Sequence, residues 1–277
     1  MKHILAFAFL LATATTQASD RFSVIPLEKL SPEQEKLIQN MLAGPRGGGD
    51  ASPEQVKRIR EHGLFSGYLQ SPDLGDRLQK LGEYVRFNTS INPRLNEFAI
   101  LITARHWAAQ YEWYAHLPLA MKAGLDPKIA EELAQNKRPA GMKEDEAAVY
   151  DFCTQLHRAK KVSDPTFKRA VELFGEKGVM DLIGVVGYYT VASMVLNVNE
   201  APVPAGQKKP LAELAADASL ANRMMLEGYR RDAEAGNGEA AKRLGDIYAK
   251  GSEGVPKDYA TSLRWYARAK ALGVKVP

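Results

Sequence analysis

The stretch that decides the fold is Arg94-Leu-Asn-Glu97-Phe-Ala-Ile-Leu-Ile-Thr-Ala-Arg105-His-Trp107-Ala-Ala-Gln110-Tyr-Glu112-Trp113-Tyr-Ala-His116. It is apolar and helix-forming, yet it contains two glutamates and a histidine near its end. Asn92 and Pro93 precede it and predict a helix start, because Asn caps helices and Pro suits the first helical position. Pro118 marks the point where a regular helix must bend or end.

Glu112 and His116 are four residues apart, so on a helix they share one face and can touch. Apolar surroundings would oppose ionisation of such a carboxylate, and a neighbouring imidazolium would favour it. This combination tunes a side chain for proton transfer near neutral pH. The same spacing also occurs in ordinary solvated surface pairs, so spacing alone leaves both interpretations open.

The rest of the chain also follows a helical pattern. Leu74, Leu78, Leu81 and Val85 recur at helical spacing from Ser71 onward, and no stretch alternates with period two, which predicts an all-α fold. The segment 179–196 is apolar on nearly every face, which is typical of a helix buried in a core or between subunits. Its Gly, Thr and Ser residues, and Asn197 directly after it, disfavour a membrane span.

Several motifs resemble the carboxymuconolactone decarboxylase family, whose superfamily also contains the alkylhydroperoxidase D-like proteins. They are Arg94-Leu-Asn-Glu97, the run Gln110 to His116, and Ala123-Gly124-Leu125. A Gly-Pro-Arg-Gly-Gly stretch at 44–48 extends the resemblance to about residues 24–204. It implies an alkylhydroperoxidase D-like helical domain over 71–206, preceded by an N-terminal extension over 19–70.

The peroxidase branch of that superfamily carries a Glu, then C-x-x-C, then a His. Glu97 and His116 match the Glu and the His, while Ala109 and Glu112 occupy the two cysteine positions. Without a thiol pair there is no disulfide exchange to run. The single cysteine, Cys153, lies in an apolar helical pattern, so we expect a buried, inert thiol.

The resemblance also implies a turn. In one straight helix Glu97 and His116 would be about 28 Å apart. A reversal near His106 to Ala108 would leave each of them about 13 Å from the bend and level with the other. No Gly or Pro predicts that turn, so the expectation comes from the resemblance alone.

Given the turn, the sequence favours a cofactor-free proton relay of Glu97, Glu112 and His116. The reaction would be that of a lyase acting on a small unsaturated carboxylic or lactone acid, with His116 as the acid. Glu112 would repel an anionic substrate unless it is protonated or paired, for example with Arg105. The expected pocket residues are Arg105, Trp107, Tyr111 and Trp113.

Three alternatives remain. A thiol peroxidase is what the superfamily would suggest, but the cysteine pair is missing. A divalent metal could bind Glu97, Glu112 and His116, since mixed carboxylate and imidazole ligands suit such ions. A non-enzymatic interaction protein would use its helical domain to form oligomers and its C-terminal tail to recruit partners.

The first residues predict export. Lys2 is followed by an apolar run from Ile4 to Ala14, then Thr16-Gln-Ala18, which predicts a secretory signal over 1–18 and a periplasmic or secreted product. The run is too short for a membrane span, so no membrane association is expected after cleavage. An uncleaved anchor is the competing interpretation. A formal charge of +4 without a basic block gives no support to nucleic-acid binding.

The tail, residues 207–277, is expected to be a linker helix and a Sel1-like repeat. Ala233 to Gly273 resembles such repeats, relatives of the tetratricopeptide repeats, in its small residues, its glycine-bounded loop and its Ala/Trp-Tyr/Ala helix. A single hairpin cannot bury its own faces, so it would pack on the first domain or on a partner protein. The family resemblance further implies a homo-oligomer, a trimer or a hexamer.

Three other histidines, His62, His106 and His157, are not expected to take part in the proton relay. His62, beside Gly63, is interpreted as an ordinary loop residue. His106 is expected at the hinge, and His157 on the surface at a helix end, where it would compensate the helix dipole. The stretch 44–50 is expected to be a flexible connector.

Overall fold

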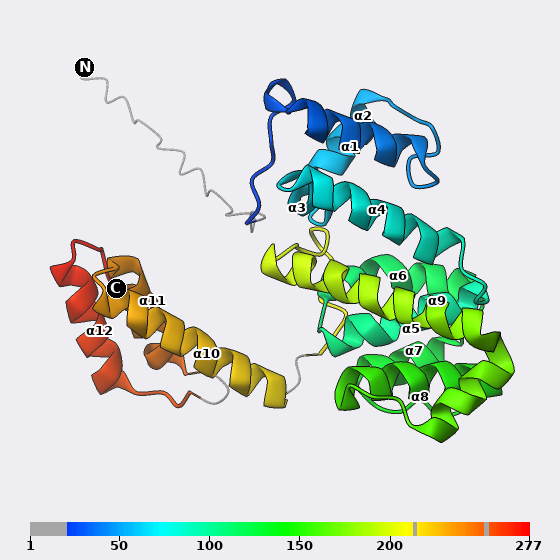
Figure 1. The fold of residues 1–277 in the computed structure, drawn as a ribbon. Helices are drawn as coiled ribbons and strands as arrows, with labels where there is room; N and C mark the ends of the chain where they lie inside the picture. The colour runs from blue at the N-terminus through cyan, green and yellow to red at the C-terminus, as the bar shows by residue number, and fades with distance from the viewer. Residues whose placement is uncertain (1–20, 213–214, 252–254) are drawn as a thin grey trace, which may run out of the picture. The chain divides into compact units, whose positions relative to one another are not determined.

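The computed structural model describes residues 21–212, 215–251 and 255–277 (Figure 1), with the backbone alone described for 215–224. Over these residues the chain forms about 12 helices and no strand, which confirms the all-α prediction. The expected signal at 1–18 lies outside them. The chain divides into two compact units, and the boundary follows Leu211, five residues beyond the expected domain end.

The first unit begins with a short 3-10 turn, Leu27–Lys29, and four helices. These are α1 (Pro32–Ala43), α2 (Pro53–Glu61), α3 (Phe65–Leu69) and α4 (Pro72–Phe87). Ser31 caps α1 in a capping box with Gln34, and Ser52 caps α2 through Gln55 N. In Figure 1, α4 lies between the N-terminal helices and α9, and it contacts α1, α3 and α9.

The centre of this unit is α5 (Pro93–His106), which is buried from Leu95 to Arg105. The helices α6, α8 and α9 pack around it, with a smaller contribution from α7. Such an apolar helix is stable only inside a core, because it has no polar face to turn toward water. The surrounding helices are α6 (Gln110–Lys122), α7 (Pro127–Ala134), α8 (Glu144–Ala159) and α9 (Asp164–Val198).

The expected reversal after α5 is present. An alanine occupies its left-handed position, so no Gly or Pro marks the turn in the sequence. Ala108 adopts a left-handed conformation with φ 49°. Its N–H donates to the Arg105 carbonyl at 3.1 Å, and Ala109 N donates to the Ala104 carbonyl at 2.9 Å. This pair of bonds is the Schellman motif, in which glycine normally takes the left-handed position. The chain therefore turns between α5 and α6 at an alanine.

α9 consists of two helical segments that meet at Gly175, whose φ of 67° is not helical. Among the described residues α9 alone is long and apolar enough to cross a membrane by length and composition, and 56% of its most apolar window is buried inside the fold. Leu182, Val185 and Ala192 are fully buried, as in a core helix.

The second unit contains α10 (Ala215–Glu234), α11 (Gly238–Lys250) and α12 (Tyr259–Ala271). α11 and α12 run antiparallel, since Ser262 Oγ donates to the Gly245 carbonyl at 2.8 Å and Asp258 N donates to the Tyr248 carbonyl at 2.9 Å. A Cβ on Gly245 would lie 2.4 Å from the Tyr266 ring, so only glycine allows this close approach.

Two side chains of α8 can be compared with expectation. Cys153 is fully buried, as predicted. The surface position predicted for His157 is wrong, because only 7% of this residue is exposed. Its Nε2 lies 3.1 Å from Thr103 Oγ1, and its ring stacks on His106 at 4.3 Å between centroids. Helix α8 therefore turns its last histidine toward α5 and away from solvent.

Replacing Ala108 by glycine should stabilise the protein, because alanine in the left-handed region costs about 1 kcal/mol that glycine avoids. We expect Ala108→Gly to raise the free energy of unfolding by about 0.5–1 kcal/mol in chemical denaturation. Ala147→Gly inside α8 is the matched control, and it should lower that free energy by a similar amount. Equal destabilisation by both substitutions would contradict the assignment of strain to Ala108.

Candidate functional site

The reversal at Ala108 brings the three predicted polar side chains together. His116 Nδ1 lies 2.7 Å from Glu97 Oε2, and His116 Nε2 lies 3.2 Å from Glu112 Oε1. All three residues are buried, with 9% of Glu97, 5% of Glu112 and 6% of His116 exposed. The imidazole is therefore held at both nitrogens, one carboxylate coming from α5 and the other from its own helix, α6.

These two carboxylates decide the charge of the imidazole. Burial alone would lower the pKa of His116, but the hydrogen bonds and charges of Glu112 and Glu97 outweigh it and raise the pKa to about 9. At neutral pH His116 is therefore an imidazolium that donates one hydrogen bond to each glutamate. A proton held in this way can leave toward either carboxylate.

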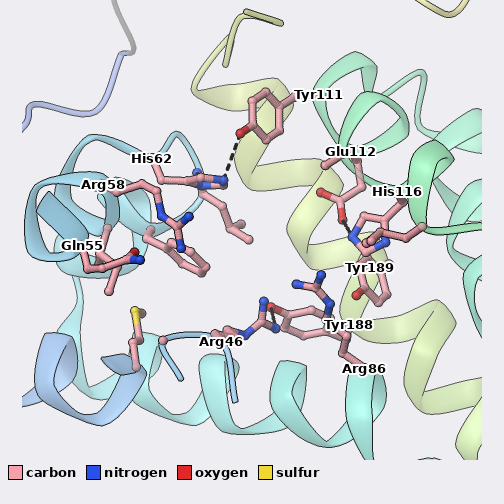
Figure 2. Close-up of a pocket in the computed structure, with 17 residues that line it drawn as sticks. Arg46, Gln55, Arg58, His62, Arg86, Tyr111, Glu112, His116, Tyr188 and Tyr189 are labelled. Atoms are coloured by element: carbon pink, nitrogen blue, oxygen red, sulfur yellow. Dashed lines mark hydrogen bonds and ion pairs between the residues drawn. The ribbon is translucent and has the colours of Figure 1, made fainter. Parts of the chain in front are cut away.

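A cavity of about 440 Å³ opens beside Glu112 and His116, two members of the relay expected from the sequence (Glu97, Glu112 and His116). Glu112 and His116 line it, while Glu97 does not, so Glu97 lies behind the histidine. Figure 2 shows the Glu112 and His116 contact on one wall, with Tyr189 next to it. The His116 and Tyr189 rings meet edge to face at 5.0 Å between centroids. The relay thus has one end at the cavity and one end inside the protein.

Three arginines share this cavity, and none of them was predicted as a site residue from the sequence. Arg46 follows α1, Arg58 belongs to α2 and Arg86 to α4, and all three line the cavity. In Figure 2, Arg58 and His62 lie across from Glu112 and His116. Among the described residues none of the three arginines forms an ion pair. Glu112 is the only carboxylate in the lining, so the cavity attracts anions.

The cavity also contains polar atoms without a protein partner. Arg46 Nε and Gln55 Oε1 are buried and form no hydrogen bond within the described protein. Arg46 Nη2 reaches the Tyr188 hydroxyl at 3.4 Å, and Gly82 of α4 makes room for both, since a Cβ there would lie 2.3 Å from Tyr188. Unsatisfied buried polar atoms are rare in folded proteins, so both atoms retain the capacity to form a hydrogen bond with a polar ligand.

Tyrosines supply most of the aromatic lining. Tyr188 and Tyr189 come from α9, and burial raises the pKa of both hydroxyls above the ordinary value of 10. The Tyr68 hydroxyl lies 3.4 Å from that of Tyr188. These phenols stay neutral across the physiological range, so they provide hydrogen bonds without adding charge.

The predicted wall residues fall in different places. Tyr111 lines the cavity, but Trp107, Trp113 and Arg105 are not part of its lining. Trp113 is a core residue, 2% exposed, and Trp107 Nε1 donates to Thr190 Oγ1 at 3.3 Å. The buried Arg105 donates to the Ala134 carbonyl at 3.2 Å. The indoles and this arginine therefore support the site from outside the cavity.

His62 is more than the ordinary loop residue that was expected. It lies between α2 and α3, lines the cavity, and places its Nε2 3.1 Å from the Tyr111 hydroxyl. Burial lowers its pKa to about 4, with Arg58 and Arg46 adding to the effect and Glu112 opposing it. His62 is neutral at pH 7, so the two histidines of one cavity carry different charges.

The side-chain arrangement gives no support to the metal alternative. Within the part of the chain that the structure describes, no group of three His, Cys, Asp or Glu side chains is placed to hold a metal ion. Glu97 and Glu112 bond opposite nitrogens of His116, so their oxygens do not converge with an imidazole lone pair on one point. A ligand set must converge in that way.

The raised pKa of His116 makes part of the stability depend on pH. The folded value of about 9 exceeds the ordinary value of 6.5, so this contribution is fully present below about pH 6.5 and is lost as pH rises through about 9. We expect an NMR titration to place the His116 pKa near 9, and Glu97→Gln to lower it. Glu131→Gln on the exposed face of α7 is the matched control and should leave it unchanged. An unshifted value in Glu97→Gln would contradict the role of that carboxylate.

Comparison with known proteins adds no family assignment. No protein-family model matches the sequence, and no curated protein matches it. What the chain does must therefore be inferred from the relay, the arginines and the cavity between them.

Proposed function

We propose that this protein is a carboxymuconolactone decarboxylase-like lyase that needs no cofactor and acts on a small unsaturated carboxylic or lactone acid. One observation carries the proposal. An imidazolium held between two buried carboxylates lies on the wall of a cavity that also contains three arginines, which form no ion pair with any residue that the structure describes. The relay supplies acid/base chemistry, and the arginines select an anionic substrate.

The positive charge of the arginines offsets the repulsion that Glu112 would exert on an acid substrate. Arg46, Arg58 and Arg86 together place three positive charges in a lining that contains one carboxylate. Guanidinium groups bind carboxylates through paired hydrogen bonds, which also fixes their orientation. The volume of about 440 Å³ falls in the range of small-molecule sites.

The chemistry follows from this arrangement. The substrate carboxylate leaves as carbon dioxide when its C–C bond breaks, and the electron pair passes into an enolate whose oxygen needs positive charge or a hydrogen-bond donor. An arginine or phenol of the cavity supplies it. His116 then provides the proton that goes to carbon, by way of Glu112 at the cavity wall, while Glu97 holds the other ring nitrogen. Solvent returns one proton to His116, which balances the reaction.

The arrangement of helices supports the finer parts of the proposal. The reversal between α5 and α6 matches the turn implied by the resemblance, and it sets Glu97 against His116 as an alkylhydroperoxidase D-like domain requires. The close approach of Gly245 to Tyr266 supports a Sel1-like hairpin. Exposed apolar residues Leu81, Met180 and Ile183 on α4 and α9 support a homo-oligomer. Export to the periplasm or beyond completes the proposal and rests on the first 18 residues of the sequence.

An interaction protein is the second candidate, and one surface of the second unit favours it. An open groove of about 560 Å³ there presents Arg230, Arg264 and Arg268 beside Trp265. Arginine and tryptophan are enriched where proteins bind one another. Such a groove is compatible with an enzyme whose tail recruits a partner.

Carbon dioxide release from a panel of small unsaturated lactone acids tests the main proposal. We expect the wild-type protein to decarboxylate at least one of them, and His116→Gln to lower kcat about 10²–10⁴-fold, the usual contribution of a positioned acid. Gln135→His, at the exposed end of α7, is a control that alters histidine content without touching the cavity. Equal inactivity of wild type and His116→Gln toward every acid would overturn the lyase proposal.

A thiol peroxidase predicts a different result for Cys153. This is the only cysteine of the chain, it is fully buried, and burial raises its pKa to about 12, so little thiolate forms. We expect Cys153→Ala to keep the decarboxylation rate within about twofold and to leave hydrogen peroxide consumption at background, because no step uses the thiol. Loss of a peroxidase activity in this variant would instead favour the thiol mechanism.

A further inference from the structure

The loop that follows α1 folds back on that helix. The stretch 44–50, expected to be a flexible connector, forms a turn in which Gly47 N and Gly48 N both donate to the Gly44 carbonyl, at 3.1 and 3.0 Å. Arg46 lies inside this turn, between the acceptor and the donors in sequence. The backbone bonds around Arg46 therefore set the direction in which its side chain leaves the loop.

Glycine is required where this turn meets α1. Gly49 N donates to the Leu42 carbonyl at 3.0 Å, and a Cβ on Gly47 would lie 2.4 Å from Leu42 Cα, so a side chain there would prevent the return. Gly48 and Gly49 have φ of 62° and 77°, in the left-handed region that favours glycine. The glycines of the stretch 44–49 thus return the chain to α1, and Arg46 is its only charged residue.

The guanidinium of Arg46 is closely packed, yet it has unused donors. It lines the cavity and lies beside Tyr188 in Figure 2, with Cζ 5.8 Å from the Phe65 ring centroid. A Cβ on Gly82 would lie 2.6 Å from Nη2, so α4 also packs on it. Within the described protein, Nε is buried and forms no hydrogen bond, and the bond from Nη2 to the Tyr188 hydroxyl is long, at 3.4 Å. Nε and Nη2 share a guanidinium edge that can hold a carboxylate through two parallel N–H groups.

The other two arginines of the cavity have different surroundings. Arg58 is exposed, so water solvates its charge. Arg86 is half-buried, and its Cζ lies 5.1 Å from the Phe87 ring centroid. Among the three, Arg46 alone has a buried nitrogen without a hydrogen-bond partner in the described part of the chain. An anion gains more from a buried donor than from a hydrated one, because charges interact more strongly where the dielectric constant is low.

We propose that Arg46 is the residue that binds the carboxylate of the ligand, side-on through Nε and Nη2, and that the turn at 44–49 positions it. A carboxylate is the ligand class that fits, because its two coplanar oxygens accept both N–H groups. The inference deepens the proposed function, on which it rests for the identity of the substrate. Arg58 and Arg86 then contribute positive charge, while Arg46 also fixes the orientation of the acid.

The position of Arg46 leaves the relay open to the rest of the ligand. Tyr188, its hydrogen-bond partner, meets the Tyr189 ring at 5.1 Å between centroids, and Tyr189 meets the His116 ring at 5.0 Å. Two tyrosine rings therefore separate Arg46 from His116 in this series of contacts. A ligand whose carboxylate is held by Arg46 can present a second group to Glu112 and His116.

Lysine at position 46 keeps the positive charge but lacks the two parallel donors. Crotonate, a small unsaturated carboxylate, is the probe for binding, and its neutral amide, crotonamide, is the control ligand. We expect Arg46→Lys to weaken crotonate binding about tenfold in calorimetry, because one hydrogen bond to a charged group is lost. Arg58→Lys should weaken it less, since an exposed arginine acts through its charge. Arg77→Lys at an exposed position of α4 is the matched control and should leave the affinity unchanged.

Three results would overturn the assignment of Arg46. The first is an affinity for crotonate in Arg46→Lys within about twofold of the wild type, which would show that charge alone suffices. The second is an equal loss in Arg58→Lys. The third is binding of crotonamide by the wild type as tight as that of crotonate, because a neutral amide forms no charge-assisted pair with a guanidinium.

Two further measurements decide the matter even if Arg46→Lys does not fold. In the wild type, the Nε–H signal of Arg46 should shift on titration with crotonate, and a signal that stays unmoved at saturation would contradict side-on binding. Gly47→Ala should displace the turn and weaken crotonate binding although Arg46 is still present. Gly228→Ala in α10, where a Cβ meets nothing within 4 Å, is its control. Full affinity in Gly47→Ala would overturn the positioning role of the turn.

Binding and turnover separate this inference from the proposed function. With a lactone acid that the wild type decarboxylates, Arg46→Lys should raise KM about tenfold and change kcat much less, since substrate and transition state lose the same contact. Crotonate binding through Arg46 without turnover of any lactone acid would refute the lyase and leave the carboxylate site standing. Turnover with an unchanged KM in Arg46→Lys would refute the site and leave the lyase. Failure of the wild type to bind crotonate would overturn the site and the preference for acids together.

Discussion

The contact between His116 and its two buried glutamates is the constraint on which the rest of the structure depends. An imidazolium with 6% of its surface exposed survives in an apolar core only because a carboxylate meets each ring nitrogen. Removing one partner of such a buried pair typically costs about 3–5 kcal/mol, since the remaining charge is left uncompensated. The left-handed Ala108 costs about 1 kcal/mol, which is smaller. The tight reversal between α5 and α6 is therefore tolerated because it brings Glu97 to the histidine.

The same contact organises charge across the cavity. With His116 protonated, the relay carries one net negative charge, while Arg46, Arg58 and Arg86 carry three positive charges on the other walls. An anion that enters is drawn toward the arginines and is brought beside the relay at Glu112. His62 contributes no charge at neutral pH and so adds a hydrogen-bond donor without disturbing this balance. The two histidines differ in charge because their partners differ. His116 contacts two carboxylates, whereas His62 contacts a backbone N–H and a phenol.

The sequence predicted the helical class and the contact of Glu97 and Glu112 with His116, and it did so for different reasons. The all-α class was predicted from helical periodicity, which is a local property of the sequence. The pairing of Glu97 with His116 came from resemblance, because nothing local marks Ala108 as a turn. The choice of wall residues failed for Trp113, which follows Glu112 by one position and so points about 100° away, into the core. The arginines could not be predicted, since they come from three separate elements that only tertiary packing brings together.

The origin of those arginines changes the role of the N-terminal extension. Arg46, Arg58 and His62 all belong to the region expected to be an arm before the domain, yet it packs in the same compact unit as the relay. Gln34 Nε2 donates to the Leu69 carbonyl at 2.9 Å, and Gly75 lets α4 approach Tyr68, where a Cβ would lie 2.6 Å from the carbonyl oxygen. These contacts fix α1 and α3 against α4, and thereby fix the anion-attracting wall. The buried contact of His116 with Glu97 and Glu112 and two of the three cavity arginines are thus encoded in separate parts of the chain. For the proposed lyase, this means that substrate preference can change through the extension while the acid/base groups are kept.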